Sequence, residues 1–327
     1  MPTGWKAASP LPSRKGVTDP LNIGIRFALY ANLMLLFGLP LFGLYALTGA
    51  ERLQNAVLPL RSIIVWLSLS GIALSLLSIV AMTASMAGVR FLAVDTASVS
   101  MMIFETTMGN AWQVRMLALV MTLAAAQFLL RNSTALWLSL VAFASAFTLS
   151  SLAWTGHGAA SEGSAGTAQL IADIIHLLGA GAWLGALAAL TVMLSRGAQA
   201  FDEDYLRLTH RVLEGFSVAG TVIVALVVGS GLVNSWMLVG PQNVLTLPAT
   251  RYGQLLIAKL LLFAIMLALA AANRFRLTPA FDRALHSGGT SGAIAKLRKS
   301  CALELGIALI ILGLVAWLGT LEPPISM

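Results

Sequence analysis

Charged residues are scarce in this chain. It has 327 residues, of which 10% are charged, whereas an ordinary soluble domain has about 25%. Twenty basic and 13 acidic side chains cannot cover the surface of a soluble globule of this size. Apolar residues make up 58% of the sequence. They fall into runs of about 20 residues, the length needed to cross a hydrocarbon core of about 30 Å. The composition therefore excludes a soluble monomer and predicts an all-α, polytopic membrane helix bundle.

Cysteine is nearly absent as well. The single Cys301 excludes an internal disulfide bond, a CxxC motif, a zinc ribbon and an iron–sulfur centre. The sequence also lacks GxSxG, HExxH and P-loop patterns, and no pair of acids is placed for glycoside hydrolysis. We therefore expect neither an enzyme activity nor an ATP-driven step. The net charge of +7 is first a topology signal in a membrane protein, so we expect no nucleic-acid partner.

Eight stretches are long and apolar enough to be transmembrane helices. Residues 1–20 contain four prolines and no apolar core, so they predict a flexible tail and neither a signal peptide nor a span. Residues 21–322 are expected to form a single eight-span domain, followed by a short C-terminal tail at 323–327. The expected spans are Asn22–Leu47, Ile63–Met86, Ala111–Leu130, Thr134–Trp154, Ala168–Leu194, Val212–Met237, Tyr252–Ala272 and Cys301–Gly319.

Two connections between these spans have distinctive sequences. Phe91–Met108 is apolar but interrupted by Asp95 and Glu105, which predicts a short helix lying on the membrane surface. Leu277–Lys299 is rich in Arg and Lys and is expected to be a solvated basic loop.

The distribution of Lys and Arg predicts the orientation. Connections one, three, five and seven carry twelve of these residues, and the opposite side carries eight. Of those eight, three lie inside spans and three lie in the N-terminal tail. Because positive charge accumulates in cytoplasmic loops, both termini are expected to be periplasmic.

The ionisable residues inside the spans are not scattered. Arg26, Arg115, Asp173, His176 and Lys259 all lie toward the predicted outer ends of their helices. Charges inside a membrane are costly and usually face the bundle interior. One interpretation is a structural set of ion pairs in which the basic residues neutralise Asp173 and Glu105. The other is an outward-opening polar cavity, whose candidate residues are Arg26, Asp95, Glu105, Arg115, Asp173 and Lys259.

Two histidines lie at the same predicted outer level. His157 follows the fourth span, and His176 lies about two turns into the fifth. Asp173 is three residues before His176 and shares its helix face, so the carboxylate could fix the imidazole tautomer, as at many metal sites. Neutral imidazole is a good ligand for copper, zinc or iron. The alternative for a membrane histidine is a satisfied hydrogen bond between helices.

Methionines gather in the same outer segment, at Met82, Met86, Met101, Met102 and Met108. Thioether sulfur selects soft ions such as Cu(I), although Met also fills cores. The candidate metal ligands are therefore His157, His176, Met101 and Met102. On the predicted inner side, His210, His286 and Cys301 fit either an exit-side site or solvated loop residues.

At this point the chain resembles the bacterial copper-resistance protein D family (CopD/PcoD-like). The resemblance is carried by five motifs in a fixed order and covers nearly everything after the N-terminal tail. The motifs are TTMGNAWQVR at Thr106–Arg115, TGHG at Thr155–Gly158, DIIHLLGAGAWLGAL at Asp173–Leu187, GSGLVNSW at Gly229–Trp236, and YGQLLIAKLLLF…NRFRLTP at Tyr252–Pro279.

This resemblance implies an eight-span protein of the bacterial inner membrane that moves copper from periplasm to cytoplasm. It implies a periplasmic copper carrier of the CopC type as partner, and His157 and His176 as the family's histidines. One motif departs from the family. An Arg-Phe-x-His pattern is common early in the first span, whereas this chain reads Arg26-Phe27-Ala28-Leu29, so that helix supplies no third histidine.

We expect a copper importer with an outward-facing His/Met site for Cu(I) or Cu(II). One alternative is a b-type haem protein or metalloreductase, although haem usually needs two facing membrane histidines. Another is a copper-delivery assembly factor that does not transport. The small residues Gly179, Gly181 and Gly185 suit helix packing within one chain as well as in a homo-oligomer.

Overall fold

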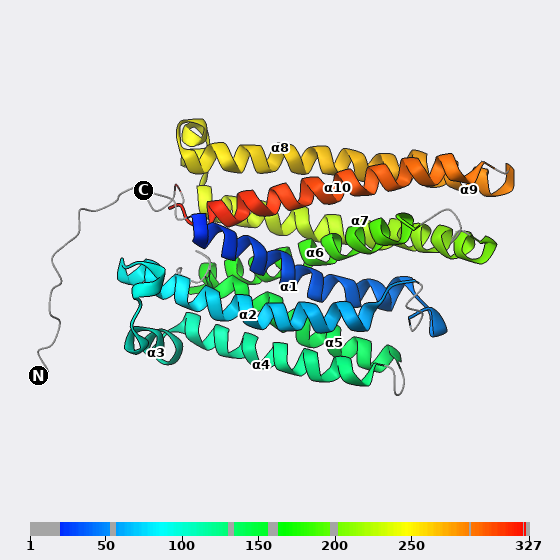
Figure 1. Ribbon diagram of the computed structural model, residues 1–327. Helices are drawn as coiled ribbons and strands as arrows, with labels where there is room; N and C mark the ends of the chain where they lie inside the picture. The colour runs from blue at the N-terminus through cyan, green and yellow to red at the C-terminus, as the bar shows by residue number, and fades with distance from the viewer. Residues whose placement is uncertain are drawn as a thin grey trace, which may run out of the picture.

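Eight long helices run side by side through the computed structural model (Figure 1). The structure describes residues 20–52, 57–129, 134–155, 163–196, 202–287, 289–322 and 324. Each long helix is apolar enough to cross a membrane, which confirms the expected all-α bundle and its eight spans. They are α1 (Pro20–Ala46), α2 (Leu60–Ala87), α4 (Thr107–Phe128), α5 (Thr134–Ser150), α6 (Gly163–Leu194), α7 (Glu203–Val239), α8 (Arg251–Ala272) and α10 (Thr290–Leu318).

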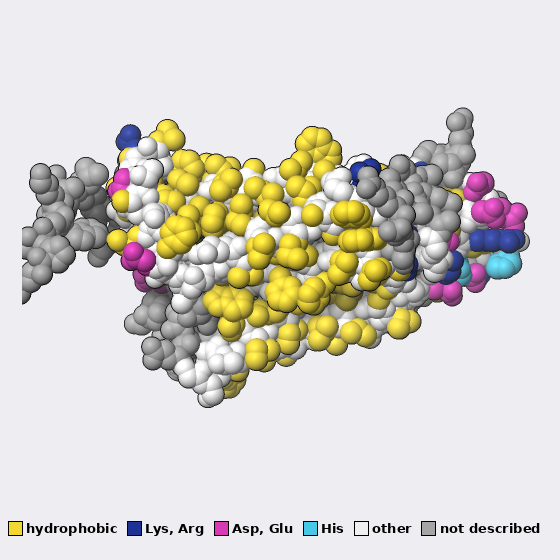
Figure 2. Space-filling view, turned by 90° about the horizontal axis from the view of Figure 1, so that it is seen from below, with side chains coloured by type: hydrophobic (Ala, Val, Ile, Leu, Met, Phe, Trp, Pro, Cys, Tyr) yellow, Lys and Arg dark blue, Asp and Glu magenta, His cyan; other side chains and the backbone are white. Residues whose placement is uncertain are grey.

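The outer surface of the bundle is apolar around its middle. On the face shown in Figure 2, hydrophobic side chains cover the centre, charged side chains lie toward both ends, and His lies at one end. Large apolar side chains of the bundle are exposed, among them Trp66 of α2 (72%) and Leu261 of α8 (62%). Contiguous exposed apolar area of this kind marks a surface that faces lipid rather than water.

Glycine allows the two central helices, α1 and α6, to pack backbone to backbone. A Cβ atom at Gly38 would collide with the Gly181 carbonyl, and one at Gly185 would collide with the Gly38 backbone. Gly179 faces α7 instead, where a Cβ would lie 2.9 Å from Val227 Cγ2. Helices in lipid associate through such close contacts between small residues. The small-residue face of α6 therefore packs within this chain.

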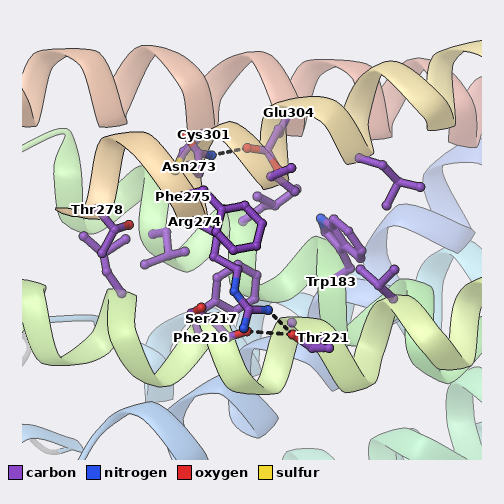
Figure 3. Close-up of a pocket in the computed structure, with 18 of the residues that line it drawn as sticks. Trp183, Phe216, Ser217, Thr221, Asn273, Arg274, Phe275, Thr278, Cys301 and Glu304 are labelled. Atoms are coloured by element: carbon purple, nitrogen blue, oxygen red, sulfur yellow. Dashed lines mark hydrogen bonds between the residues drawn. The ribbon is translucent and has the colours of Figure 1, made fainter. Parts of the chain in front are cut away.

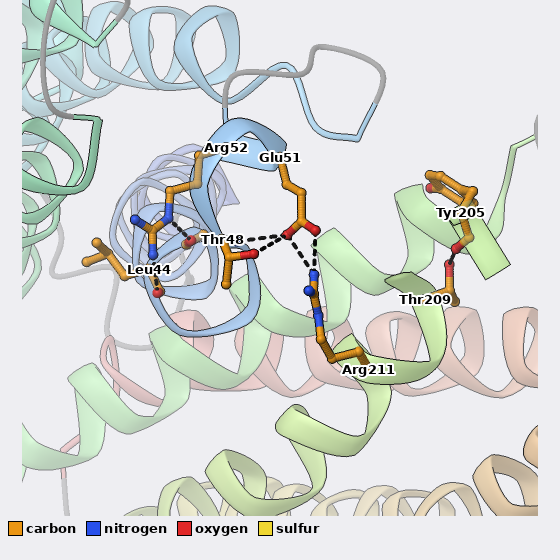
Figure 4. Close-up of polar contacts among 8 residues, drawn as sticks. Leu44, Thr48, Glu51, Arg52, Tyr205, Thr209 and Arg211 are labelled. Carbon is orange, nitrogen blue, oxygen red and sulfur yellow. Dashed lines mark hydrogen bonds and ion pairs between the residues drawn. The ribbon is translucent and has the colours of Figure 1, made fainter. Parts of the chain in front are cut away.

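A polar clasp joins α1 to α7 at the end of the bundle where α1 ends (Figure 4). Glu51, in the turn Gly49–Arg52, accepts hydrogen bonds from Arg211 of α7 at 2.6 and 2.7 Å and from the Thr48 backbone N–H at 2.8 Å. Burial acts to raise the pKa of Glu51, but the hydrogen bonds from Arg211 and Thr48 outweigh it and hold the pKa below its ordinary value. Arg52 caps α1 by donating to the Gly43 and Leu44 carbonyls at 3.0 and 2.8 Å.

The connection 91–108 contains a helix, as expected, but a shorter one. A turn at Phe91–Ala93 leads to α3 (Thr96–Glu105), and α4 already begins at Thr107. Asp95 is the N-cap of α3 and accepts a hydrogen bond of 2.6 Å from the Ser98 N–H. This bond and a second from the Ser98 hydroxyl hold the pKa of Asp95 below its ordinary value.

The expected solvated loop at 277–299 is wrong. A π-helical turn (Asn273–Leu277) continues α8 into α9 (Thr278–Ser287), and α10 begins at Thr290. Phe281 of α9 is fully buried, and His210 of α7 pairs with Asp282 at 3.2 Å. Helix α7 likewise begins at Glu203, nine residues before the expected start. Its 37 residues extend roughly 55 Å, well beyond the hydrocarbon core. A search for apolar stretches detects only the part of a helix that lies in lipid. In the sequence, the polar start of α7, the helix α9 and the polar start of α10 therefore resemble loops.

Candidate functional site

Four of the ionisable residues expected to share a cavity do line one. This His176 cavity has a volume of about 190 Å³ and lies toward the end of the bundle where α1 begins and α10 ends. Its wall includes Arg26 of α1, Asp173 and His176 of α6, and Lys259 of α8. Helices α7 and α10 complete it, so residues distant in sequence converge on one space inside the bundle.

The hydrogen bonds of His176 define its tautomer. Its Nδ1 lies 3.2 Å from the Val227 carbonyl oxygen and 3.2 Å from Ser230 Oγ, both on α7. The Ser230 hydroxyl donates its proton to the Leu226 carbonyl, so both neighbours of Nδ1 act as acceptors. Nδ1 therefore carries the proton and donates, which leaves the lone pair on Nε2. This is the form of imidazole that ligates a metal.

The expected role of Asp173 in fixing this tautomer is wrong, because α7 supplies the groups that contact Nδ1. The ring also packs against Gly231, where a Cβ atom would lie 3.3 Å from His176 Cε1. His176 lies further from the start of its helix than expected. Helix α6 begins at Gly163, thirteen residues earlier, so the imidazole is roughly 20 Å along the helix rather than two turns.

The charges of the cavity are only partly balanced. Asp173 interacts electrostatically with Lys259, and Arg26 Nη2 donates to the Tyr30 hydroxyl at 3.2 Å. Among the described residues, Arg26 Nε and Asn234 Oδ1 are buried without a hydrogen-bond partner. Because buried polar atoms are normally paired, these two fit a cavity that holds water or a polar occupant.

The structure does not bring the other candidate cavity residues to this wall. Arg115 is 1% exposed, and its Nε donates to Ser151 Oγ at 2.9 Å. Asp95 caps α3, and Glu105 is exposed at the end of that helix. Within the described ranges, no salt bridge joins Arg26, Arg115 or Lys259 to Asp173 or Glu105. Of the ion-pair interpretation, the structure shows only the longer-range interaction between Asp173 and Lys259.

The candidate metal ligands are not gathered in one described cluster. Met101 and Met102 lie on α3 and do not line the His176 cavity. Met101 is 55% exposed, whereas Met102 is buried with the Thr106 hydroxyl 3.6 Å from its sulfur. His157 lies outside the described residues. In the part of the chain that the structure describes, no three residues among His, Cys, Asp and Glu form a metal-binding group.

The sequence analysis did not predict two polar residues of α7 near His176. Ser230 contacts His176 Nδ1 and Asn234 lines the cavity; they are four residues apart and therefore share one helix face. Two polar side chains at that spacing inside an apolar span were the available signal.

The sequence analysis also did not predict a second buried acid. The expectation that the ionisable residues inside the spans all lie toward the outer ends of the helices is therefore wrong. Glu304 of α10 is 1% exposed and lines a cavity of about 250 Å³, the Glu304 cavity, in the opposite half of the bundle. Cys301, expected on the inner side as a loop residue or exit-site residue, is buried in the same wall. His210 is in α7, and His286 is exposed on α9.

Comparisons with known proteins give a consistent result. Residues 17–167 match the N-terminal domain model of copper resistance protein D-like proteins, and residues 210–318 match the copper resistance protein D model. Copper resistance protein D of Pseudomonas syringae pv. tomato is 48% identical over 93% of this chain and 97% of its own length.

Two further relatives are more distant. Inner membrane protein YebZ of Escherichia coli (strain K12) is 28% identical over 92% of this chain and 98% of its own length. Copper transport protein CutJ of Bacillus subtilis (strain 168) is 29% identical over 82% of this chain but 49% of its own length. No solved structure matches the chain.

Proposed function

Because the chain belongs to the copper resistance protein D family of multi-pass inner-membrane proteins, we propose that it moves copper ions from the periplasm to the cytoplasm. The His176 cavity receives the ion. The observation that carries this proposal is the imidazole of His176, which is held inside the membrane domain with its lone pair on Nε2. Imidazole nitrogen is a ligand suited to copper.

The charges of the cavity favour passage over retention. Asp173 supplies one negative charge, and Arg26 and Lys259 supply two positive charges. A cation in this cavity is repelled by the excess positive charge while the imidazole attracts it. Such a site binds weakly, as a conducting site must, since the ion has to leave again.

The loop charges support the proposed orientation. If the positive loops face the cytoplasm, the His176 cavity lies in the periplasmic half of the membrane, where an importer would receive copper. A periplasmic carrier of the CopC type would then deliver copper to this end. His157, Met101 and Met102 remain candidate ligands at the same end, and they would help capture the ion before it reaches His176.

Uptake of isotopic copper into liposomes that hold only this protein tests the proposal. We expect the wild-type protein to accumulate copper and His176→Ala to reduce the initial rate at least tenfold, because the imidazole is the one described histidine in the cavity. His286→Ala is the matched control, since His286 is exposed on α9. No uptake by the wild-type protein would indicate a delivery factor, and normal uptake by His176→Ala would reject the imidazole as ligand.

A further inference from the structure

The Glu304 cavity opens to the outer surface of the bundle between α7 and α8 (Figure 3). Among the described helices, α7 packs on α6 and α8 packs on α10, whereas α7 and α8 hardly touch each other. Thr221, Ala271 and Phe275 line the cavity and are exposed, so they lie at its mouth. Val218 and Val222, on the same stretch of α7, are 69% and 58% exposed. The mouth therefore lies on an apolar surface that faces lipid.

The wall of this cavity is mostly apolar. Its polar side chains Glu304 and Asn273 are hydrogen-bonded to each other. A space of about 250 Å³ that is open to a bilayer and lined in this way suits a hydrocarbon chain better than water. The apolar side chains come from all four bordering helices and include Leu187, Leu190, Leu213, Phe216, Val224, Leu267 and Leu297.

Arg274 places a positive charge at the mouth. It extends from the π-helical turn after α8 and donates a hydrogen bond to the Thr221 hydroxyl on α7 (Figure 3). Its guanidinium carbon lies 5.3 Å from the centroid of the Phe275 ring, which also holds it in place. Guanidinium has five N–H donors in a planar fork, so the bond to Thr221 leaves donors for a phosphate group.

Arg274 also lies at the depth of lipid headgroups. Arg251 begins α8, and Arg274 follows it by 23 residues, which is roughly 35 Å of helix. The hydrocarbon core between two headgroup layers is about 30 Å thick. Arg251 and Arg274 therefore lie near opposite boundaries of the core, and the phosphate of a lipid in the adjacent leaflet would be level with the guanidinium.

The charge around this boundary favours an anionic lipid. Residues 273–299 contain six basic residues and one acid, Asp282. Basic pockets between transmembrane helices are typical binding sites for anionic headgroups. The basic residues are Arg274, Arg276, Arg283, Lys296, Arg298 and Lys299.

We propose that the Glu304 cavity binds an anionic diacyl phospholipid, whose phosphate pairs with Arg274 and one of whose acyl chains enters the cavity between α7 and α8. This lipid site goes beyond copper transport and does not depend on it.

Trp183 reports whether a chain enters the cavity. It lines the cavity from α6 and is 4% exposed, so lipids on the outer surface do not contact it. The purified full-length protein is placed in phosphatidylcholine bilayers that contain increasing fractions of phosphatidylglycerol with brominated acyl chains, because bromine quenches a nearby indole. The chain has eight tryptophans, so the signal of Trp183 is obtained as the difference between the wild type and Trp183→Phe.

Brominated phosphatidylglycerol should quench Trp183 at a fraction at least tenfold lower than brominated phosphatidylcholine does. This comparison needs no variant at the mouth of the cavity. Equal quenching by the two lipids, or no quenching of Trp183, would overturn the inference.

Substitution of Arg274 tests the headgroup contact. Arg274→Gln should raise the fraction of phosphatidylglycerol needed for half-maximal quenching at least tenfold. Arg276→Gln is the matched control, since Arg276 is exposed two residues further on and does not line the cavity. Size-exclusion chromatography checks that both variants are folded. Equal losses in the two variants would show general attraction of anionic lipid to this end and would overturn the site at Arg274.

Substitution of Gly220 tests the chain contact. A Cβ atom at Gly220 would lie 3.7 Å from Phe216 Cζ, an ordinary contact, so Gly220→Leu should be accommodated and fill part of the cavity. We expect quenching of Trp183 to fall at least threefold, whereas Gly229→Leu, outside the cavity lining, should match the wild type. Unchanged quenching in Gly220→Leu would contradict entry of the chain.

Inorganic phosphate distinguishes a lipid from a free anion. Added phosphate should leave the quenching of Trp183 unchanged, and its reversal would assign Arg274 to free phosphate and overturn the lipid site. Every measurement is made without copper. Failure of the lipid site would therefore leave the transport proposal standing, and absence of copper uptake would leave the lipid site standing.

Discussion

Glycine has opposite roles in two regions of the bundle. One region is the contact between α1 and α6, and the other is the α7–α8 seam, the line of two cavities bordered by α6, α7, α8 and α10. At the first, Gly38, Gly181 and Gly185 let two backbones touch, and no space remains between the helices. Along the seam, Gly231 instead makes room for the imidazole of His176, and two cavities remain open. The contact between α1 and α6 is therefore close-packed, whereas the seam holds two cavities whose walls carry ionisable side chains. A rigid support is what a pre-organised binding site needs.

The largest effect is expected from a substitution at the contact between α1 and α6. Gly185→Leu places a side chain where the Gly38 backbone lies, so α1 and α6 must separate along most of their length. We expect little or no folded protein in the membrane fraction, measured by fluorescence-detected size-exclusion chromatography. Gly229→Leu, on α7 with open space around its Cβ, is the control and should express normally. Normal yield of both variants would show that the backbone contact is dispensable.

A smaller effect is expected from charge within the seam. Asp173→Asn leaves Lys259 and Arg26 without a negative neighbour in the cavity, so a cation meets two uncompensated positive charges. We expect uptake in liposomes to fall about tenfold, which corresponds to about 1.4 kcal/mol. Adding Lys259→Met to Asp173→Asn should restore part of the rate, because the two residues interact. Additive losses in the double variant would contradict the electrostatic explanation.

The smallest effect lies outside the membrane, at the clasp between Glu51 and Arg211. The pKa of Glu51 is lowered in the folded protein, so its contribution to stability is present above the unfolded pKa of about 4.3 and is lost as the pH falls below it. Because Arg211 is half exposed, this contribution should be less than about 1 kcal/mol.

Thermal unfolding between pH 6 and pH 3 measures this contribution. The melting temperature of Glu51→Gln should fall less steeply with acid than that of the wild type. Glu203→Gln, which removes an exposed i,i+4 pair within α7, is the matched control and should follow the wild type. Identical slopes for Glu51→Gln and wild type would show that the clasp does not stabilise the fold.

Much of the cavity could be anticipated because costly residues stand out in an apolar sequence. Arg26, Asp173 and Lys259 are conspicuous inside spans, and the alternation of spans put them at one end of the bundle. Arg115 satisfied the same criterion yet lies elsewhere, bonded to Ser151. Position along a helix gives the depth of a residue, but rotation about the helix axis and the choice of neighbouring helix decide what it contacts.

The misreadings have a related cause. Glu304 is a single acid in an otherwise apolar span, and its hydrogen-bond partner Asn273 comes from the π-helical turn that follows α8. Likewise α9 is too polar to be found by hydropathy, and its burial of Phe281 is a tertiary contact.

Sequence alone determined that the chain lies in a membrane, that it has eight spans and that several charges lie inside them, because hydrophobic length and the cost of charge in lipid are properties of each segment by itself. Tertiary structure decided which of those charges meet, which nitrogen of His176 keeps its lone pair, and that a second cavity faces Glu304. Those outcomes depend on contacts between helices far apart in the chain, and the periodicity of a single helix does not specify its neighbour.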